Sequence, residues 1–273
     1  MTNLPQELLP MAVRAAFAAG QAIMEVYGKK TFKTRLKKDL SPVTEADRAA
    51  HGVISGQLDT ASIPLLSEEG AEIPYEIRRR WDRFWLVDPL DGTKEFIRRN
   101  DEFTVNIALI EGQVPVMGVI YAPCLDLMYF ASHGTGACRI SGYASLDDQI
   151  SDSSGLLGKA EALPLRIPRR NYTVVASRSH RNEQTNLFIK RLEKEHPGLR
   201  LVSTGSSLKF CLMAEGKADI YPRFGRTMEW DTAAGDAIAR TSGCLVSVHD
   251  SGDGLSYNKE VLSNPWFIVL REP

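Results

Sequence analysis

Apolar residues recur along much of this chain at the spacing of an amphipathic helix. The clearest case runs over residues 8–27, with Val13 and Phe17 on one face and Gly28 as a stop. Pro10 fits this helix only if it lies in the first turn, because a proline further in removes a backbone hydrogen bond. Further helices are predicted over residues 41–58, 182–195, 206–215 and 232–241.

Shorter apolar runs predict β-strands. Residues 84–87 form a run typical of a buried strand, and Asp88 and Pro89 should end it. A turn at Glu111 and Gly112 should join two later strands. The remaining candidates are 63–66, 103–110, 114–121, 127–131, 172–176, 199–203, 218–221, 244–248 and 266–270. Because helices and strands mix throughout, the fold class is a layered α/β or α+β fold.

The pattern changes over residues 141–160, where Ser, Gly and Asp are dense and the apolar periodicity disappears. Such a segment is typical of a surface insertion or a linker. We therefore expect an N-terminal α+β subdomain over residues 1–142, a Ser- and Gly-rich insertion over 143–165, and a C-terminal α/β subdomain over 166–273.

Composition and charge narrow the classes of protein. The chain has 33 basic and 34 acidic side chains, and 43% of its residues are hydrophobic, as in ordinary globular proteins. No apolar stretch approaches the roughly 20 residues of a membrane span, and the start of the chain is expected to be a mature helix, not a signal peptide. A net charge of −1 argues against broad capture of nucleic acid, but a small anionic substrate needs only a local site.

The four cysteines predict a reducing environment. No two of them have CxxC spacing, and none has a histidine near it at zinc-finger spacing. Free thiols in the cytoplasm are therefore expected. The cysteines are Cys124, Cys138, Cys211 and Cys244.

The candidate chemistry begins with the string that follows the apolar strand at 84–87. Asp88, Asp91, the Leu90 carbonyl and the Thr93 hydroxyl supply four oxygen donors within six residues, and Mg²⁺ prefers such ligands. Asp-Pro and Asp-Gly-Thr are also common in turns, so a purely structural role is the alternative. The spacing excludes an EF-hand and disfavours an aspartyl nucleophile.

Three more acidic motifs follow the same logic. Glu68 comes after another apolar run, although adjacent acids are often merely exposed. Asp231 stands at the entrance to a helix of small residues, where it would serve as an N-cap, as a metal ligand or as both. Asp47 belongs to a weaker motif that starts at Thr44, a candidate helix-entry residue.

Taken in order, these motifs resemble the lithium-sensitive, Mg²⁺-dependent phosphatases of the inositol monophosphatase superfamily. The closer similarity is to the 3′(2′),5′-bisphosphate nucleotidase branch, through residues 85–97, 100–110, 177–180, 205–210, 221–225 and 230–235. The resemblance covers residues 8–267 and is poorest across 141–165. It implies an alternating αβαβα sandwich of the inositol monophosphatase and fructose-1,6-bisphosphatase type.

The resemblance also implies roles for individual residues. It makes Glu68, Asp88, Asp91, Asp231 and the Leu90 carbonyl the ligands of two or three Mg²⁺ ions, most of them in the N-terminal subdomain. It makes Asp47 and Thr93, together with Glu68, the catalytic residues that activate water. The implied substrate contacts are Glu68, Asp91, Gly92, Thr93, His180, Ser206, Lys209, Arg223 and Asp231.

The activity implied is hydrolysis of the 3′-phosphate of adenosine 3′,5′-bisphosphate to AMP and phosphate, which recycles a by-product of sulfur assimilation. An inositol- or sugar-phosphate phosphatase and a non-catalytic nucleotide sensor are the alternatives. The expected location is the cytoplasm, with peripheral contact at the inner face of the membrane left open by the resemblance. Monomer and homodimer also stay open.

Overall fold

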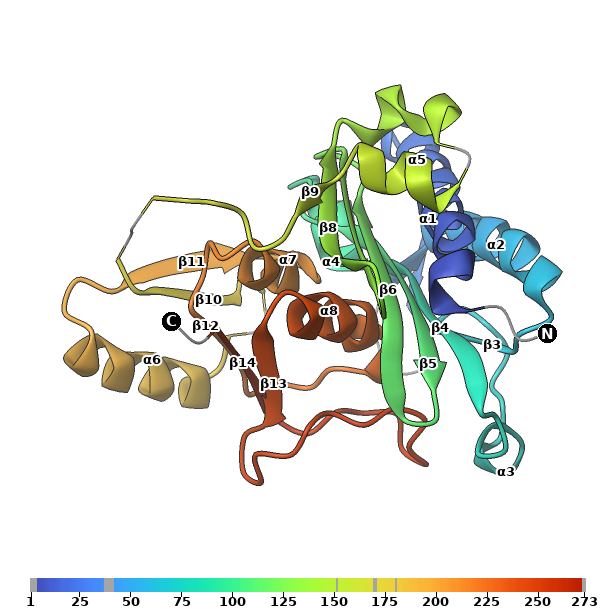
Figure 1. Cartoon of the computed structure of the whole chain (residues 1–273). Coiled ribbons are helices and arrows are strands. Elements are labelled where there is room, and N and C mark those ends of the chain that lie inside the picture. The colour runs from blue at the N-terminus through green and yellow to red at the C-terminus, as the bar shows by residue number, and fades with distance from the viewer. Residues whose placement is uncertain (1–3, 37–41, 151, 169–170, 180, 272–273) are drawn as a thin grey trace.

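The chain folds into five alternating layers of helices and sheets (Figure 1). The computed structural model describes residues 4–36, 42–150, 152–168, 171–179 and 181–271. The predicted substrate contact His180 therefore lies outside the described residues, as does Ser41, the first residue of a predicted helix. The layered α/β class predicted from the mixture of helices and strands is confirmed.

The helices cover three of the five layers. Helices α1 and α2 pack on one face of the larger sheet, α7 and α8 lie between the two sheets, and α6 packs on the smaller sheet. The helices are α1 (Pro5–Tyr27), α2 (Glu45–Leu58), α3 (Tyr75–Arg78), α4 (Thr93–Arg98), α5 (Ser153–Gly158), α6 (Glu183–Glu195), α7 (Leu208–Ala214) and α8 (Glu229–Thr241).

Two main sheets form the other layers, beside a small pairing of β1 (Thr34–Leu36) with β2 (Pro42–Thr44). The larger sheet has the order β3-β4-β5-β6-β7-β8-β9, and only its β3–β4 pair is parallel. Its strands are β3 (Leu65–Ser67), β4 (Arg83–Asp91), β5 (Thr104–Glu111), β6 (Val114–Ala122), β7 (Leu127–Ser132), β8 (Gly136–Ser141) and β9 (Glu161–Ala162). The smaller sheet has the order β11-β10-β12-β14-β13, built from β10 (Thr173–Ser177), β11 (Arg200–Thr204), β12 (Ile220–Arg223), β13 (Cys244–Val248) and β14 (Phe267–Arg271).

Helix α8 packs closely against the larger sheet. Its residues 232–239 are almost all small, and a Cβ atom on Gly118 of β6 would collide with the backbone of Ala234. Glycine at this position lets the helix backbone touch the strand. The close approach brings the first turn of α8 to the edge where β3 and β4 end.

Several predicted boundaries were wrong for identifiable reasons. Pro10 lies inside α1 and not in its first turn, where Pro5 stands instead. Strand β4 continues past Asp88 to Asp91, with a register shift across the proline. Helix α2 begins after Thr44, and α8 begins at Glu229, three residues earlier than predicted.

The segment predicted to be a surface insertion contributes to the core. Tyr143, Ile150 and Leu156 are buried in the cluster beneath α1, and β9 extends the larger sheet beside β8. These buried residues stand at irregular intervals, Tyr143 in a 3₁₀ turn, Ile150 just after another and Leu156 in a short helix, so no periodic signal marks them. The segment therefore supplies core residues that the loss of apolar periodicity did not indicate.

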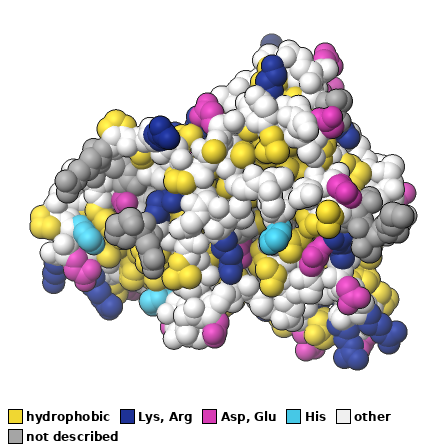
Figure 2. Space-filling view, in the orientation of Figure 1, with side chains coloured by type: hydrophobic (Ala, Val, Ile, Leu, Met, Phe, Trp, Pro, Cys, Tyr) yellow, Lys and Arg dark blue, Asp and Glu magenta, His cyan; other side chains and the backbone are white. Residues whose placement is uncertain are grey.

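The surface of the described residues agrees with the near-zero net charge. On the face shown in Figure 2, basic and acidic side chains are interspersed, with the densest basic group near the α3 corner. Within the described ranges no helix has both the length and the apolar character needed to cross a membrane.

Candidate active site

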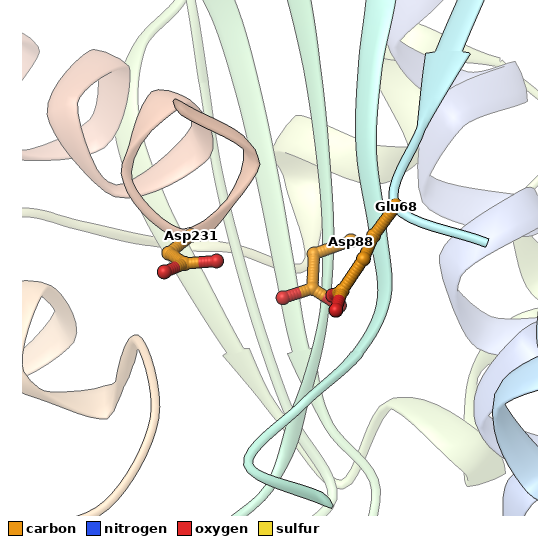
Figure 3. Close-up of side chains that lie close together, drawn as sticks. All are labelled: Glu68, Asp88 and Asp231. Carbon is orange, nitrogen blue, oxygen red and sulfur yellow. The ribbon is translucent and has the colours of Figure 1, made fainter. Parts of the chain in front are cut away.

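Three elements bring carboxylates together where β3 and β4 end (Figure 3). Glu68 follows β3, Asp88 belongs to β4, and Asp231 lies in the first turn of α8. The parallel β3–β4 pairing extends to the Glu68 amide, which donates to the Val87 carbonyl at 3.1 Å. One oxygen from each of the three acids lies within 4.8 Å of the others.

The irregular end of β4 shapes the rest of the acidic wall. The Leu90 amide donates to Asp88 Oδ1 at 3.1 Å, and the ladder with β5 resumes only at Asp91. Gly92 has φ of +94°, a conformation that favours glycine. The chain then enters α4, and the Thr93 hydroxyl lies 3.4 Å from the Leu90 carbonyl oxygen. The turn therefore presents two carboxylates, a carbonyl and a hydroxyl to one cleft.

Asp47 and Thr93 form a hydrogen-bonded pair beside this wall. Asp47 is the third residue of α2, and its Oδ2 accepts 2.7 Å hydrogen bonds from both the amide and the hydroxyl of Thr44. Its other oxygen, Oδ1, accepts the Thr93 hydroxyl at 3.1 Å. Burial raises the pKa of Asp47 to about 6, so the carboxylate is ionised but basic at neutral pH.

The acidic cluster carries strong mutual repulsion. Burial is the first cause of a raised pKa at Asp88, and the charges of Glu68, Asp91 and Asp231 raise that pKa further. Burial, followed by the charges of Asp91 and Glu68, raises the pKa of Asp231 to about 8. A bound divalent cation would offset the repulsion among these buried carboxylates. A set of ligands made only of oxygen atoms suits hard ions such as Mg²⁺. The donor set therefore fits a metal.

A consequence for stability can be measured. Carboxyls with raised native pKa values bind protons more tightly in the folded state, so stability falls as pH rises from about 4 through the native values. Melting temperatures in EDTA are expected to fall between about pH 5 and about pH 8, while saturating Mg²⁺ keeps them higher, with a gap that widens with pH. Asp231→Asn should flatten the EDTA curve. Parallel curves with and without metal would contradict the prediction.

A cationic wall faces the acidic one across the same cleft, whose volume is about 230 Å³. Lys209 on α7 and Arg223 at the end of β12 are both buried. Burial, and then the charge of Arg223, lowers the pKa of Lys209 to about 8. The Lys209 ammonium donates to the Ser206 carbonyl, and Arg223 Nη2 donates to the Arg226 carbonyl at 2.9 Å.

Two buried polar atoms in this wall have no hydrogen-bond partner among the described residues. They are Ser206 Oγ and Arg223 Nε, and both residues line the cleft. Ser206 also has φ of +41°, which is uncommon for a residue with a side chain. Unpaired buried donors are costly, so they indicate a ligand that supplies acceptors.

Most of the predicted site residues lie in one cleft. Those lining the common cleft are Glu68, Asp88, Leu90, Asp91, Gly92, Thr93, Ser206, Lys209, Arg223 and Asp231. Asp47 does not line it but reaches it through Thr93. Asp91 does not belong to the group of three carboxylates, each of which has an oxygen within 4.8 Å of the other two. The prediction for His180 lies outside the described residues.

Sequence reasoning missed the residues that hold Asp91. The Asn106 amide lies 3.5 Å from Asp91 Oδ2, and Asn106 Oδ1 accepts hydrogen bonds from Ser207 at 2.7 Å and Thr104 at 3.1 Å. Glu95 is buried close by and binds Ser179 at 2.6 Å. One signal was present: Asn106 is a polar residue within an apolar strand, an unusual position unless it has a partner.

Comparisons with known proteins agree with this geometry. The inositol monophosphatase family profile matches residues 4–267. The chain is 47% identical to the 3′(2′),5′-bisphosphate nucleotidase CysQ of Salmonella typhimurium, and 45% identical to that of Escherichia coli K12, in each case over 96% of this chain and 99% of the relative. The crystal structure of CysQ from Bacteroides thetaiotaomicron is similar with a TM-score of 0.91 and 50% identity, over 98% of both chains.

Proposed function

Because the chain belongs to the inositol monophosphatase family, whose members are metal-dependent phosphatases, we propose that it is a Mg²⁺-dependent 3′(2′),5′-bisphosphate nucleotidase. It would remove the 3′-phosphate of adenosine 3′,5′-bisphosphate and release AMP and phosphate. One observation carries the proposal: a single cleft joins a carboxylate cluster to the buried cations Lys209 and Arg223. The former suits metal and the scissile phosphate, and the latter a second phosphate.

The acidic wall would hold the metal. Glu68, Asp88 and the Leu90 carbonyl would form one set of ligands, and Asp88, Asp91 and Asp231 a second that shares Asp88. Bound Mg²⁺ lowers the pKa of water and stabilises the charge that develops on phosphate and the leaving oxygen.

The chain's own residues would move the proton. The Thr93 hydroxyl donates its hydrogen to Asp47 Oδ1. The hydroxyl oxygen of Thr93 can in turn accept a proton from the attacking water. Asp47, with a pKa of about 6, is then ionised before the reaction and protonated after the transfer. The water oxygen bonds to phosphorus as the bond to the 3′-oxygen breaks. That oxygen takes a proton from solvent to become a hydroxyl, and Asp47 returns its proton to solvent after the reaction.

The cationic wall gives the selectivity. Arg223 Nε has no partner among the described residues and Lys209 is a point charge, so together they suit the oxygens of a 5′-phosphate. Inositol 1-phosphate lacks a second phosphate and would leave these cations unused. We also propose a cytoplasmic location, supported by four cysteines that are all free thiols.

A substrate panel tests the function. Phosphate release is measured from adenosine 3′,5′-bisphosphate, inositol 1-phosphate and fructose 1,6-bisphosphate, with Mg²⁺, with EDTA and with added Li⁺. The expected result is a preference for the nucleotide, with activity lost in EDTA and lowered by Li⁺. A preference for inositol 1-phosphate would replace the nucleotidase proposal with the phosphatase alternative. No release from any substrate would favour a non-catalytic sensor.

A further inference from the structure

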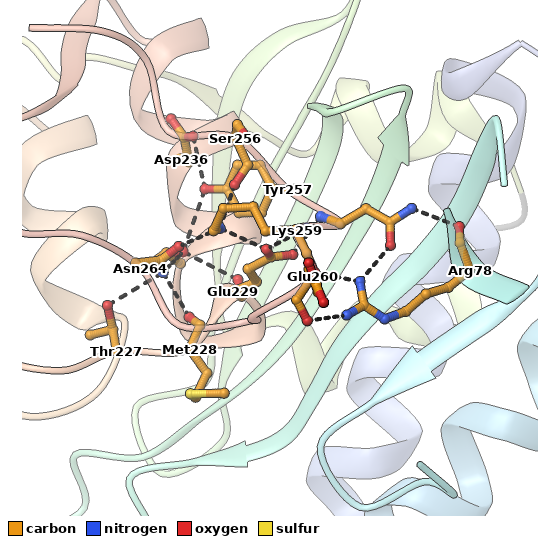
Figure 4. Close-up of polar contacts among 12 residues, drawn as sticks. Arg78, Thr227, Met228, Glu229, Asp236, Ser256, Tyr257, Lys259, Glu260 and Asn264 are labelled. Atoms are coloured by element: carbon orange, nitrogen blue, oxygen red, sulfur yellow. Dashed lines mark hydrogen bonds and ion pairs between the residues drawn. The ribbon is translucent and has the colours of Figure 1, made fainter. Parts of the chain in front are cut away.

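The first turn of α8, which carries Asp231, is held by a buried polar network (Figure 4). The network comes from the loop over residues 256–264 and from Arg78 at the end of α3. None of these residues lines the catalytic cleft. They connect to the site through the first turn of α8 and through Thr227 and Thr232, which line the cleft.

Asn264 binds on both sides of Asp231. Its side-chain amide donates 2.9 Å hydrogen bonds to the Met228 carbonyl and to the Thr232 hydroxyl, and its backbone amide donates to Thr227 at 2.8 Å. Met228 is the residue whose amide donates to Asp231 Oδ2 at 2.9 Å. Asn264 therefore fixes the backbone that sets the direction of the Asp231 carboxylate.

Glu229 anchors the same turn from below. Its side chain is fully buried and accepts hydrogen bonds from the Asn258 amide at 2.6 Å and the Lys259 amide at 3.0 Å. The Lys259 ammonium binds the same carboxylate at 2.6 Å. All these hydrogen bonds are made to a carboxylate and are therefore charge-assisted. Such bonds are stronger than those between neutral groups, so Glu229 holds the turn firmly.

Arg78 extends the network to the Glu68 side of the site. It donates to Asn258 Oδ1 at 2.9 Å and to the Glu260 carbonyl at 2.7 Å, while the Asn258 amide group donates back to the Arg78 carbonyl at 2.8 Å. Helix α3 ends at Arg78 and follows the segment that starts at Glu68. The network thus joins the two chain segments that supply opposing carboxylates.

Direct packing between those segments leaves a gap on one side. A cavity of about 390 Å³ lies between them, lined among others by Glu68, Tyr75, Met228 and Trp230. On this side, the hydrogen bonds around the cavity add to the packing of α8 on the larger sheet in setting the position of Asp231 relative to Glu68. Their geometry has to be held closely, because metal sites tolerate only small displacements of their ligands.

We propose that Asn264, supported by the Glu229 network, is a positioning residue for Asp231 and sets the metal affinity of the acidic cluster. The inference rests on the proposed metal site. Residues that orient ligands from outside the coordination sphere typically change metal affinity about 10- to 100-fold when they are replaced. Because Asn264 contacts the Met228 backbone and the Thr232 hydroxyl and not a ligand oxygen, we expect the lower end of that range.

The test compares Asn264→Ala with the control Tyr129→Phe, which removes a buried 2.9 Å hydrogen bond to Glu215 on elements that carry no site carboxylate. Mn²⁺ binding to the metal-free protein is measured by electron paramagnetic resonance, and the Mg²⁺ dependence of turnover is measured beside it. In Asn264→Ala the Mn²⁺ dissociation constant and the half-saturating Mg²⁺ concentration should both rise about 10-fold. Excess Mg²⁺ should restore most of kcat, with KM for the nucleotide within about twofold of the wild-type value. Tyr129→Phe should leave both metal values unchanged.

The outcomes separate this inference from the proposed function. If wild-type protein binds no Mn²⁺, the metal site itself is wrong. If it does bind Mn²⁺ and Asn264→Ala binds equally well while melting at a lower temperature, Asn264 is only structural and the inference fails. Should Asn264→Ala not fold, the nearly isosteric Thr232→Val removes one of the two acceptors, together with the 3.2 Å bond from this hydroxyl to the Glu229 carbonyl, and a rise of about threefold in the Mn²⁺ dissociation constant is expected. An unchanged constant in that variant overturns the inference.

Discussion

Asp91→Asn is expected to lower kcat/KM for adenosine 3′,5′-bisphosphate by about 10³-fold or more at saturating Mg²⁺. The substitution removes a formal charge from the ligand set but keeps the shape of the side chain. Asn106 donates to Asp91 Oδ2, and an amide oxygen at the same position can accept that bond. The loss should therefore come from metal binding and charge stabilisation, not from misfolding.

The same variant should be more stable than the wild type when metal is absent. Burial is the main cause of the raised pKa of Asp91, so its ionised form destabilises the metal-free protein. Melting curves in EDTA and in Mg²⁺ check this, and the increase in melting temperature on adding Mg²⁺ should shrink. Asp126→Asn is the matched control, because Asp126 accepts a 2.9 Å bond from Tyr121 away from the cleft. Retained turnover in Asp91→Asn would exclude Asp91 as a metal ligand.

Arg223→Gln is expected to remove the preference for a doubly phosphorylated nucleotide. The ratio of kcat/KM for adenosine 3′,5′-bisphosphate to that for adenosine 3′-monophosphate should fall about 100-fold, since a charge-assisted bond to phosphate contributes roughly 1.5–3 kcal/mol. Activity toward the monophosphate should change little, because that substrate has no 5′-phosphate to bind. The effect should appear mainly in KM.

Arg226→Gln is the companion variant for this prediction. Arg226 also lines the cleft but is exposed, so solvent and salt screen its charge. Its effect on the substrate ratio should be less than about threefold and should vanish at high salt. If the two arginine variants behave alike, or if both substrates lose activity equally in Arg223→Gln, Arg223 does not recognise the 5′-phosphate.

Local sequence patterns predicted most of the larger sheet. The strands over 104–111, 114–122 and 127–132 are long, apolar and separated by turn residues, so each one is recognisable alone. Strand β8 was missed because glycines stand at and before its start, which lowers its β-propensity. The core residues Tyr143, Ile150 and Leu156 were missed because they pack from irregular turns beneath α1.

The sequence likewise predicted one part of the site and missed another. Its acids were found because each belongs to a short motif with recognisable spacing, and the structure brings Glu68, Asp88 and Asp231 together. Their supporting residues carry no such motif. Arg78 and Asn258, for example, are 180 residues apart and meet only through the tertiary fold.

Two carboxylates of this site each cap a helix with one oxygen and leave the other oxygen available to the site. Asp47 and Asp231 each stand at the third position of a helix, and each gives Oδ2 to the backbone amide three residues earlier. The helix start therefore uses one oxygen and leaves the other to face the chemistry. An asparagine at either position could still accept the capping bond through its single oxygen. A single substitution of this kind would keep the fold and remove the charge that the chemistry needs. In this fold, one substitution could therefore convert an enzyme into a nucleotide-binding protein without activity.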